Sequence, residues 1–395
     1  MKVAQINITY GKGSTGKICA AVSRILKEKN IDNRMFYSQG VSDDPLSVCF
    51  QKPYEIKINA LKTRVFGDWG FEARTATGRL IGMLDEFKPD IVHLHNLHGH
   101  NVHLEMLFDY LRKSEVKVFW TFHDCWAFTG YCMYYDHVNC SRWKTKCENC
   151  PQRKTYSLFF DRSSNLYQKK KELFSSLDLT IVTPSFWLAN QVKQSFLGDK
   201  KIKVIHNGID LSVFSPTESD FRTRYDIENR FVVLGVAFNW EKRKGIDVFA
   251  ELSKRLDPKR YAIVLVGTDD SVDKSLPDSI IKIHRTRDQH ELAEIYSDAD
   301  VFVNPTREDN FPTVNIESLA CGTPVVTFDT GGSPECIDET SGTVIGCDDI
   351  DSLIKEIQRI KNEKPFSRSA CVSRAARFDM NDRFREYADL YINPN

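Results

Sequence analysis

Hydrophobic and polar positions along this chain follow two alternating periods. Short runs rich in β-branched residues, typical of buried strands, are separated by longer stretches whose apolar residues recur at helical spacing. Helices are predicted, for example, over residues 17–29 and 101–113. Strands are predicted over residues 3–8, 34–37, 91–94, 117–121 and 180–183, and then over 231–235, 261–266, 280–283, 301–304 and 324–328. This order of elements predicts an α/β protein built on parallel sheets.

The two series of strands predict two domains. With 395 residues, the chain exceeds the roughly 250–300 residues at which one hydrophobic core stops growing. The turn dipeptide Asn207-Gly208 and an irregular stretch around Pro216 separate the series. We expect one Rossmann-like domain over residues 1–190, a second over 200–375, and a C-terminal helix over 376–395 that could pack back on the first domain.

Composition places the protein among globular chains. Hydrophobic residues make up 41% and charged residues 27%, and no apolar run approaches the roughly 18 residues needed to span a bilayer. The first residues alternate like a strand and lack the apolar core of a signal peptide. We therefore expect a cytoplasmic protein whose contact with the cytoplasmic membrane, if it has any, is peripheral.

Charge is unevenly distributed along the chain. Lys plus Arg and Asp plus Glu both total 54, but residues 1–190 hold 26 basic and 19 acidic residues. The segment 67–71, Gly-Asp-Trp-Gly-Phe, has basic residues on either side and could lie on a membrane surface. Core aromatics beside a solvated basic face explain the same pattern equally well. The basic residues concerned are Lys57, Lys62, Arg64, Arg74 and Arg79.

Residues 304–326 carry the most informative chemistry. A strand ends and a helix begins there, and Pro312 suits a first helical turn. The free N–H groups of Thr313 and Val314 would point at the strand ends, where a diphosphate binds favourably. Glu317 lies about one turn further in, where its carboxylate can accept hydrogen bonds from a ribose diol.

The spacing of Asp309 and Glu317 resembles the Glu-x7-Glu signature of retaining GT-B glycosyltransferases of family 4, with Asp309 standing where the first Glu is usual. Glu308 precedes it, so either carboxylate could reach the sugar, although the register from Phe311 favours Asp309. A Gly-Gly-x-Pro-Glu turn of the same family is matched up to Glu335, which the resemblance assigns to the sugar pocket. The resemblance implies a GT-B fold, two Rossmann-like domains with a crevice between them.

Two basic residues lie upstream of that segment. Lys244 matches the Lys-Gly lysine with which the family holds the donor phosphates, and Arg243 is a substitute for an arginine that the family carries several residues earlier. If they hold the leaving diphosphate, no catalytic metal is required. Two Asp-x-Asp motifs, at 298–300 and 349–351, have the form that binds metal in another glycosyltransferase fold. Their places before a strand and at a helix start predict structural roles instead.

A glycine-rich loop follows the first strand. Gly13, Ser14, Thr15 and Gly16 nearly complete a P-loop, but Ile18 stands where that motif needs a hydroxyl for Mg²⁺. GT-B enzymes use a similar loop beside the donor phosphate, and we assign these four residues to donor binding.

Histidines crowd the end of the strand 91–94. His123, after the next strand, matches the histidine that the family places beside the transferred sugar, and we predict it as a catalytic residue together with Asp309 and Glu317. His95 and Asp124 are predicted to contact the acceptor. A metal site is the alternative for the crowded group, which comprises His93, His95, His98, His100 and His103.

Four cysteines form a separate cluster. Cys132, Cys140, Cys147 and Cys150 supply enough thiols for a structural zinc ion, and the last two form a Cys-x2-Cys pair. Reduced thiols and an iron–sulfur cluster are the alternatives, and His137 could replace one thiolate. The surrounding insertion, residues 125–151, resembles one found in colanic-acid-type bacterial polysaccharide glycosyltransferases.

The resemblance implies a retaining transfer of a hexose or deoxyhexose from a nucleoside diphosphate sugar, of UDP or GDP type. The acceptor would be a glycan or a polyprenyl-diphosphate-linked glycan in synthesis of O-antigen, capsule or exopolysaccharide. A sugar-nucleotide epimerase or hydrolase is one alternative. A zinc-stabilised nucleic-acid-binding protein is another, but such a protein has no need of a diphosphate cradle, so no nucleic-acid partner is expected.

Overall fold

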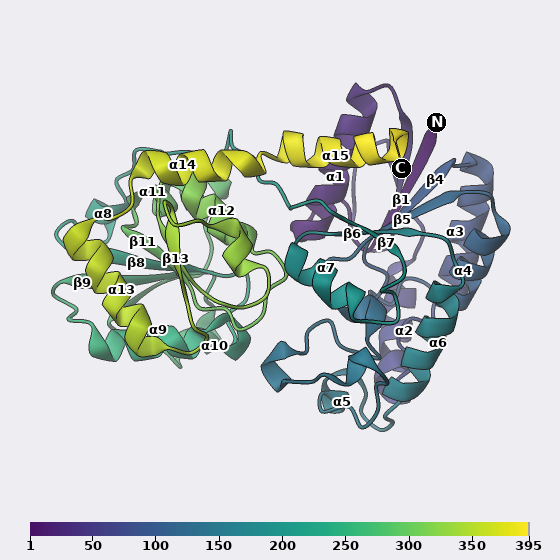
Figure 1. The fold of residues 1–395 in the computed structure, drawn as a ribbon, viewed down its shortest axis with the longest axis horizontal. Helices are drawn as coiled ribbons and strands as arrows, with labels where there is room; N and C mark the ends of the chain where they lie inside the picture. The colour runs from purple at the N-terminus through teal and green to yellow at the C-terminus, as the bar shows by residue number, and fades with distance from the viewer. Residues whose placement is uncertain (394–395) are drawn as a thin grey trace. The chain divides into compact units, whose positions relative to one another are not determined.

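The computed structural model describes residues 1–393 and divides the chain into two units. The first contains residues 1–206 together with those from 383 onward, and the second contains residues 207–382. Strand β7 thus belongs to the first unit, and the unit boundary follows it. Each unit is an α/β domain with one parallel sheet (Figure 1).

The first unit has a seven-stranded parallel sheet in the order β3-β2-β1-β4-β5-β6-β7. Strand β1 lies in the middle, with Val3 opposite Asn33 on one side and Ile91 on the other. The order runs outward from β1 in both directions, so the strand order reverses between β1 and β4. The strands are β1 (Lys2–Asn7), β2 (Asp32–Tyr37), β3 (Ser47–Cys49), β4 (Ile91–Leu94), β5 (Lys117–Thr121), β6 (Thr180–Thr183) and β7 (Lys201–Val204).

Helices pack on this sheet through their apolar stripes. Leu80, Phe108 and Phe174, from three helices, share one core with Leu94 and Trp120 of the sheet. The helices are α1 (Gly13–Glu28), α2 (Pro53–Phe66), α3 (Arg74–Phe87), α4 (Leu104–Lys113), α5 (Arg153–Tyr156), α6 (Ser163–Ser175) and α7 (Phe186–Lys193).

The last helix, α15 (Met380–Ile392), brings the end of the chain back to the first unit. Tyr391 packs on Phe119 of β5, and its hydroxyl lies 2.5 Å from Nδ1 of His93. Tyr387 is buried beside the same histidine and accepts a hydrogen bond from Thr121 at 3.3 Å. Residues 383–393 therefore contribute to the core of the first unit.

The second unit has a six-stranded parallel sheet in the order β10-β9-β8-β11-β12-β13. Its first strand, β8, is again central, so the strand order reverses between β8 and β11. The strands are β8 (Phe231–Val236), β9 (Tyr261–Val266), β10 (Ile280–Ile283), β11 (Val301–Asn304), β12 (Val325–Phe328) and β13 (Gly342–Ile345).

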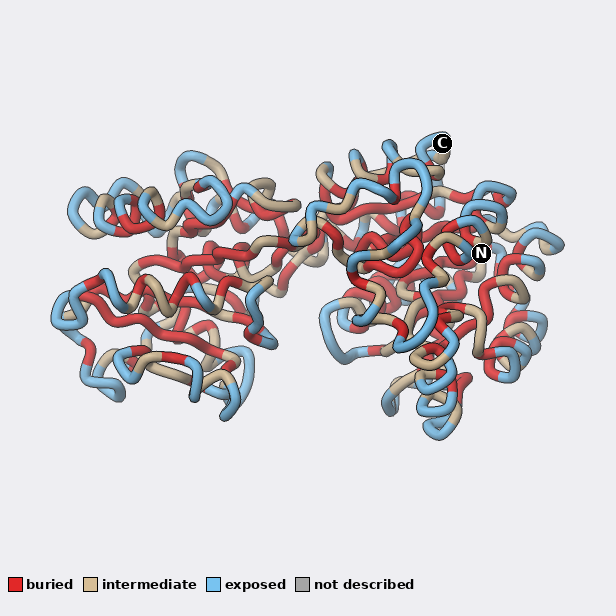
Figure 2. Tube along the Cα trace, turned by 90° about the horizontal axis from the view of Figure 1, so that it is seen from below, coloured by how far each residue is buried: buried red, intermediate tan, exposed pale blue. Residues whose placement is uncertain are grey.

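Two cores flank the second sheet. Successive side chains of a strand point to opposite faces, and accordingly Leu234 and Val233 belong to different cores. One core includes α11 (Gln289–Asp298), α12 (Thr313–Ala320) and α14 (Arg368–Ala375), and the other includes α9 (Ile246–Arg255) and α13 (Ile350–Glu363). Figure 2 shows the strands of both units as buried and the outer faces of the helices as exposed. The short helices α8 (Phe221–Arg224) and α10 (Asp270–Asp273) complete the unit.

The fold class, two Rossmann-like halves, is confirmed, whereas three edge strands, β3, β7 and β13, are absent from the sequence prediction. All three are short: β3 has three residues, and β7 and β13 have four each. Edge strands need less apolar surface, so their sequences resemble loops. Within residues 1–393, no helix combines the length and apolar character required to cross a bilayer.

Candidate functional site

A pocket of about 820 Å³ opens at the carboxyl ends of the strands in the second unit. The ends of β8, β9 and β10 form one side, and Val314 and Glu317 of α12 form the other. Open α/β sheets bind ligands where the strand order reverses, as it does here between β8 and β11. The lining residues are Val236, Ala237, Phe238, Asn239, Val266, Gly267, Thr268, Asp269, His284, Arg285, Thr286, Leu292, Val314 and Glu317.

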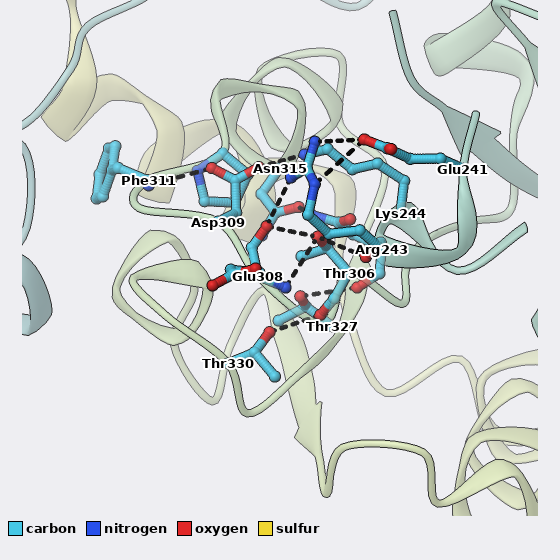
Figure 3. Close-up of polar contacts among 12 residues, drawn as sticks. Glu241, Arg243, Lys244, Thr306, Glu308, Asp309, Phe311, Asn315, Thr327 and Thr330 are labelled. Carbon is cyan, nitrogen blue, oxygen red and sulfur yellow. Dashed lines mark hydrogen bonds and ion pairs between the residues drawn. The ribbon is translucent and has the colours of Figure 1, made fainter. Parts of the chain in front are cut away.

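Lys244 and Asp309 form an ion pair in the loops above the same sheet (Figure 3). Lys244 ends the short 3₁₀ helix η4 (Lys242–Lys244), and its Nζ lies 2.5 Å from Oδ2 of Asp309. The other carboxylate oxygen of Asp309 accepts the main-chain N–H of Phe311 at 3.3 Å. Both charged side chains remain partly exposed, so a ligand can reach them.

The two adjacent acids have different surroundings. Glu308 is buried, with 2% of its surface exposed, whereas Asp309 is only half-buried. The main-chain carbonyl of Glu308 accepts a hydrogen bond from Arg243 at 3.0 Å. Asp309 is thus the more accessible of the two acids, which supports the assignment of the sugar contact to Asp309 that the register from Phe311 favours.

A glycine turn closes against Asp309. Gly331 has a φ of +56°, and a Cβ there would lie 1.8 Å from the carbonyl oxygen of Asp309. Gly332 donates its N–H to that oxygen at 3.0 Å. The buried Asn315 of α12 accepts from Asn304 at 2.7 Å and donates to Ser333 at 3.5 Å. These contacts hold β11, the start of α12 and the glycine turn together.

The predicted donor helix is α12, and it begins one residue later than predicted. Pro312 is its N-cap, with Thr313 as the first helical residue. The first amides of a helix have no intrahelical acceptor, so those of Thr313 and Val314 are available to an anion. Glu317 accepts a hydrogen bond from Tyr296 at 3.3 Å. Burial, with the Glu317 carboxylate next to it, raises the pKa of Tyr296 well above its usual range.

Some predicted donor residues contribute packing or main-chain contacts. The side chains of Phe311 and Pro312 are buried, and Phe311 packs on Phe378, which supports the turn. Glu335 lies half-buried in the 3₁₀ helix η5 (Ser333–Cys336), and its carbonyl accepts from Arg374. The guanidinium of Arg243 also donates to Glu241. Arg243, Lys244, Asp309 and the turn before Glu335 therefore belong to one connected structure.

Each Asp-x-Asp motif has an aspartate that contacts main-chain or side-chain donors of its own unit. Asp300 pairs with Arg222 at 2.9 Å and accepts the main-chain N–H of Val232 at 2.7 Å. Asp349 caps α13 by accepting from Ser352. These contacts give Asp300 and Asp349 structural roles, in agreement with their places before a strand and at a helix start.

In the first unit, the glycine loop forms the start of α1. Gly13 and Ser14 are exposed, Thr15 is half-buried, and Gly16 is buried with its Cα against Thr9. Asn7 at the end of β1 donates to Thr15 at 3.4 Å. Because the helix begins at Gly13, Gly-Ser-Thr-Gly is its first turn and not the longer loop of a P-loop.

Three histidines are in contact at the carboxyl ends of β4 and β5. Nδ1 of His95 lies 3.1 Å from Nε2 of His123, and the two rings are stacked with centroids 5.4 Å apart. His93 packs on His95 and lies 2.8 Å from Thr121 through its Nε2. His95 and His123 are thus brought together, one buried and one half-buried.

Gln5 sets the tautomers of this pair. Its amide nitrogen donates to Ser23 at 2.8 Å, so its oxygen is directed to Nε2 of His95 at 3.2 Å. Nε2 of His95 therefore carries the proton, and its Nδ1 accepts from Nε2 of His123. A neutral His123 then has Nδ1 as its acceptor nitrogen. Burial lowers the pKa of His123 to about 4 and that of His93 to about 3, and it lowers the pKa of His95 well below its usual range.

Asp124 pairs with His98 instead of His123. Oδ2 of Asp124 lies 2.7 Å from Nε2 of His98, and its Oδ1 accepts the main-chain N–H of Trp126 at 2.9 Å. Burial works to raise the pKa of Asp124, but the neighbouring His98 and these hydrogen bonds outweigh it and hold the pKa low. Asp124 therefore remains ionised and fixes His98 beside the predicted acceptor residues.

The four clustered cysteines line one small cavity of the insertion. Cys132 donates a hydrogen bond to Cys150. This hydrogen bond, together with burial, raises the pKa of Cys132, and it lowers the pKa of Cys150 against the opposing effect of burial. Burial raises the pKa of Cys147 to about 12, and its sulfur accepts the N–H of Gly130 at 3.3 Å. All eleven cysteines are free thiols.

The structural zinc site predicted at these four cysteines stays a prediction. Within residues 1–393, no group of three or more His, Cys, Asp or Glu side chains is arranged so that it could hold a metal ion. The crowded histidines contact different protein groups: His93 and His95 contact Thr121, Gln5 and His123, whereas His98 contacts Asp124 and His100 contacts Glu72. The sulfurs of Cys132 and Cys147 accept hydrogen bonds from the side-chain amide of Gln152 and the main-chain N–H of Gly130.

Two buried polar residues near the site are absent from the sequence prediction. Gln5 interrupts an apolar strand, and that interruption is a usable signal. Lys170 is fully buried in α6, and its ammonium donates to the carbonyls of Trp126, Thr129 and Gly130 at 2.8, 3.1 and 3.2 Å. Within a run of three lysines nothing distinguishes it from Lys169 and Lys171.

Comparison with known families identifies both halves of the chain. Residues 50–213 match the model for Glycosyltransferase Family 4, and residues 228–363 match the model for Glycosyl transferases group 1. Over the full length of both chains, the protein is 22% identical to the putative colanic acid biosynthesis glycosyl transferase WcaC of Escherichia coli K12.

Solved structures show the same fold. A glycosyltransferase from Rickettsia africae superposes with a TM-score of 0.70 at 16% identity, covering 99% of this chain and 97% of that one. Anabaena Alr3699/HepE in complex with UDP-glucose superposes with a TM-score of 0.67 at 15% identity, covering 98% of this chain and 99% of that one. With two Rossmann-like halves and family models on both, the chain belongs to the family 4, group 1 glycosyltransferases of GT-B fold.

Proposed function

We propose that this glycosyltransferase moves a hexose or deoxyhexose from a UDP- or GDP-sugar to a glycan, with retention of anomeric configuration. The acceptor we propose is a glycan linked to polyprenyl diphosphate, in the synthesis of a bacterial surface polysaccharide. The relative named for colanic acid biosynthesis and the neighbour solved with UDP-glucose support this assignment.

One observation carries the proposal: the pocket at the strand ends of the second unit has Glu317 on one wall and the start of α12 beside it. A nucleoside needs a crevice with a carboxylate for its ribose hydroxyls, and a diphosphate needs free amides and cations. Glu317 supplies the first, and the amides of Thr313 and Val314 supply the second. No other described feature of the second unit combines these groups.

Each group then has a role in the transfer. Lys244 and Arg243 balance the charge that develops on the departing diphosphate, which is electrostatic stabilisation of the transition state without need of a catalytic metal. Asp309 and Glu335 accept hydrogen bonds from sugar hydroxyls. In the first unit, Nδ1 of a neutral His123 is suited to accept a hydrogen bond from a substrate hydroxyl. The departing phosphate takes the acceptor's proton.

Thermal stabilisation by nucleotides tests the proposal. We expect UDP or GDP to raise Tm by mass action, and ADP and CMP to do so far less. Glu317→Ala should abolish the increase, whereas Glu339→Ala, an exposed glutamate elsewhere in the second unit, should retain it. Stabilisation by none of the four nucleotides would contradict the donor assignment.

A turnover measurement separates transfer from other reactions of a sugar nucleotide. With the stabilising nucleotide sugar and an extract of lipid-linked glycans, we expect nucleotide release to depend on the acceptor. Equal release without acceptor would indicate a hydrolase, and NMR of the product's anomeric carbon decides retention.

A further inference from the structure

Exposed apolar side chains of the first unit are concentrated in two segments. Large hydrophobic residues with high exposure include four in α2 and three in the segment 158–160. Leu61 is 65% exposed and Phe159 is 67% exposed. Single exposed apolar residues are common, but a contiguous group of them marks an interaction surface. We call this group the apolar surface; it consists of Tyr54, Ile58, Leu61, Phe66, Leu158, Phe159 and Phe160.

Helix α2 has the inverse of the usual amphipathic pattern. Its buried residues are Asn59 and Thr63, and both make polar contacts with His100: Asn59 donates to the main-chain carbonyl, and the Thr63 hydroxyl lies 3.1 Å from Nδ1. Tyr54, Ile58 and Leu61 follow one another at i, i+4 and i+7 on the outer side. A surface helix of a soluble domain normally directs such a stripe to the core.

The second segment is fixed against the end of α2. Leu158 donates its main-chain N–H to the carbonyl of Arg64 at 2.9 Å, and Arg64 donates to the carbonyl of Thr155 at 2.6 Å. Tyr131 donates to the carbonyl of Gly67 at 3.2 Å, and a Cβ on Gly67 would lie 3.3 Å from the carbonyl of Phe160. Figure 1 shows α2 and α5 in the same part of the first unit. The two segments therefore form one surface.

Basic residues surround this surface. Lys57 and Lys62 of α2 are exposed, as is Lys154 of α5. Among the nearby acids, Glu55 forms an ion pair with Arg79 and Asp68 lies 3.4 Å from Arg162. The exposed Asp161 accepts the main-chain N–H groups of Cys150 and Ser163, and the three lysines outnumber it. The net charge around the apolar side chains is therefore positive. Apolar residues with a cationic surround match a bilayer that contains anionic lipids.

A pocket of about 420 Å³ opens within the same surface. Leu61 and Arg64 of α2 lie on one side, and Trp69, His100 and Tyr156 lie on the other. Trp69 itself is buried, 7% exposed, so the aromatic segment 67–71 supports this pocket and does not form the exposed surface. Of the two interpretations of segment 67–71, the burial of Trp69 favours core aromatics.

We infer that the apolar surface docks the first unit onto an anionic membrane, with Leu61 and Phe159 inserted among the lipids and Lys57 and Lys62 facing their headgroups. This inference rests on the proposed function, since an acceptor attached to a polyprenyl diphosphate lies in such a membrane. The pocket beside Leu61 and Arg64 then opens at the membrane surface, where a lipid-linked glycan would enter.

Vesicle sedimentation tests the inference. We expect the protein to sediment with phosphatidylcholine vesicles in which about one lipid in four is phosphatidylglycerol, and to bind pure phosphatidylcholine far less, particularly at low salt. The variant Leu61→Ser/Phe159→Ser should weaken binding roughly tenfold or more for each side chain. The variant Lys57→Glu/Lys62→Glu should lose the preference for anionic vesicles.

Val41→Ser is the matched control, because Val41 is 75% exposed in the same unit but outside the apolar surface. The inference is overturned if the unmodified protein does not bind vesicles, or if Leu61→Ser/Phe159→Ser binds them as strongly as the unmodified protein. A dimer in sedimentation velocity that this variant abolishes, without vesicle binding, would assign the surface to a second copy of the chain. Nucleotide stabilisation of the same proteins reports on the second unit, so failure of the proposed donor site is seen separately.

Discussion

The ammonium of Lys244 lies 2.5 Å from Oδ2 of Asp309, and both side chains are partly exposed. Two residues 65 positions apart in sequence thus neutralise each other where η4 meets the loop after β11. A donor diphosphate would compete with Asp309 for Lys244. We expect the pair to separate when donor binds, which releases Asp309 to a sugar hydroxyl.

Lys244→Met should impair use of the donor. Loss of one preorganised cation at a departing phosphate lowers kcat/KM by about 100-fold to 1000-fold, because the charge that develops in the transition state is no longer balanced. Lys242→Met is the matched control, since Lys242 lies in the same 3₁₀ helix with its side chain exposed. Steady-state kinetics with the stabilising nucleotide sugar would contradict the role if the two variants lost activity equally.

Substitutions at Glu308 and Asp309 should have separate effects. Glu308→Ala removes a buried side chain and should lower the free energy of unfolding by about 1–3 kcal/mol. Asp309→Asn changes a half-buried group and should alter stability by less than about 1 kcal/mol, while lowering kcat/KM by about tenfold or more. Urea denaturation together with kinetics checks both. If Glu308→Ala instead lowered kcat/KM with little change in stability, while Asp309→Asn lowered stability, the sugar contact would be assigned to Glu308.

The sequence predicts the two sheets and the donor segment because both depend on local patterns. Buried parallel strands such as β9 are continuous apolar runs, and the loop from β11 into α12 has its acids at fixed spacing from Pro312. The short edge strands β3 and β13 lack such a pattern. Their pairing with β2 and β12 is a property of the folded sheet.

Contacts between distant segments could not be predicted in the same way. His93 is a buried core residue because Tyr391 arrives almost 300 positions later. Asp124 follows His123 in sequence but pairs with His98, since the loop after β4 lies beside it. The spacing of the cysteines brings four of them around one cavity, but spacing alone does not report which thiols contact each other, as Cys132 and Cys150 do.

The contact among His93, His95 and His123 predicts an acid-sensitive fold. Their pKa values in the folded protein are depressed, to about 3 for His93 and about 4 for His123, against about 6.5 when unfolded. Below pH 6.5 the unfolded chain therefore binds more protons. Stability is fully present above pH 6.5 and should fall progressively as pH decreases toward 4.

His123→Gln isolates one member of this group. It should reduce the dependence of the urea midpoint on pH between 6.5 and 4, because one fewer proton is taken up on unfolding. His290→Gln, at an exposed histidine of the second unit, should leave that dependence unchanged. If the two variants showed the same dependence as the unmodified protein, His123 would titrate normally in the folded state.

Lys170→Met should destabilise the insertion that follows β5. The buried ammonium donates to three carbonyls of residues 126–130 and lies 3.5 Å from the centroid of the Trp126 ring. Methionine retains the volume but leaves those carbonyls without their donor, so the free energy of unfolding should fall by about 2–4 kcal/mol. Lys171→Met, at the exposed neighbouring lysine, is the control and should change the free energy of unfolding by less than about 0.5 kcal/mol.

Limited proteolysis distinguishes a local from a global effect of Lys170→Met. If the lysine holds only the loop, cleavage within residues 125–151 should accelerate while the Tm of the second unit, followed through nucleotide stabilisation, stays constant. Because Asp124 accepts the N–H of Trp126, loosening this loop should also free His98. The variant should therefore lose affinity for acceptor while retaining affinity for nucleotide, and unchanged acceptor affinity would show that Asp124 is positioned without Lys170.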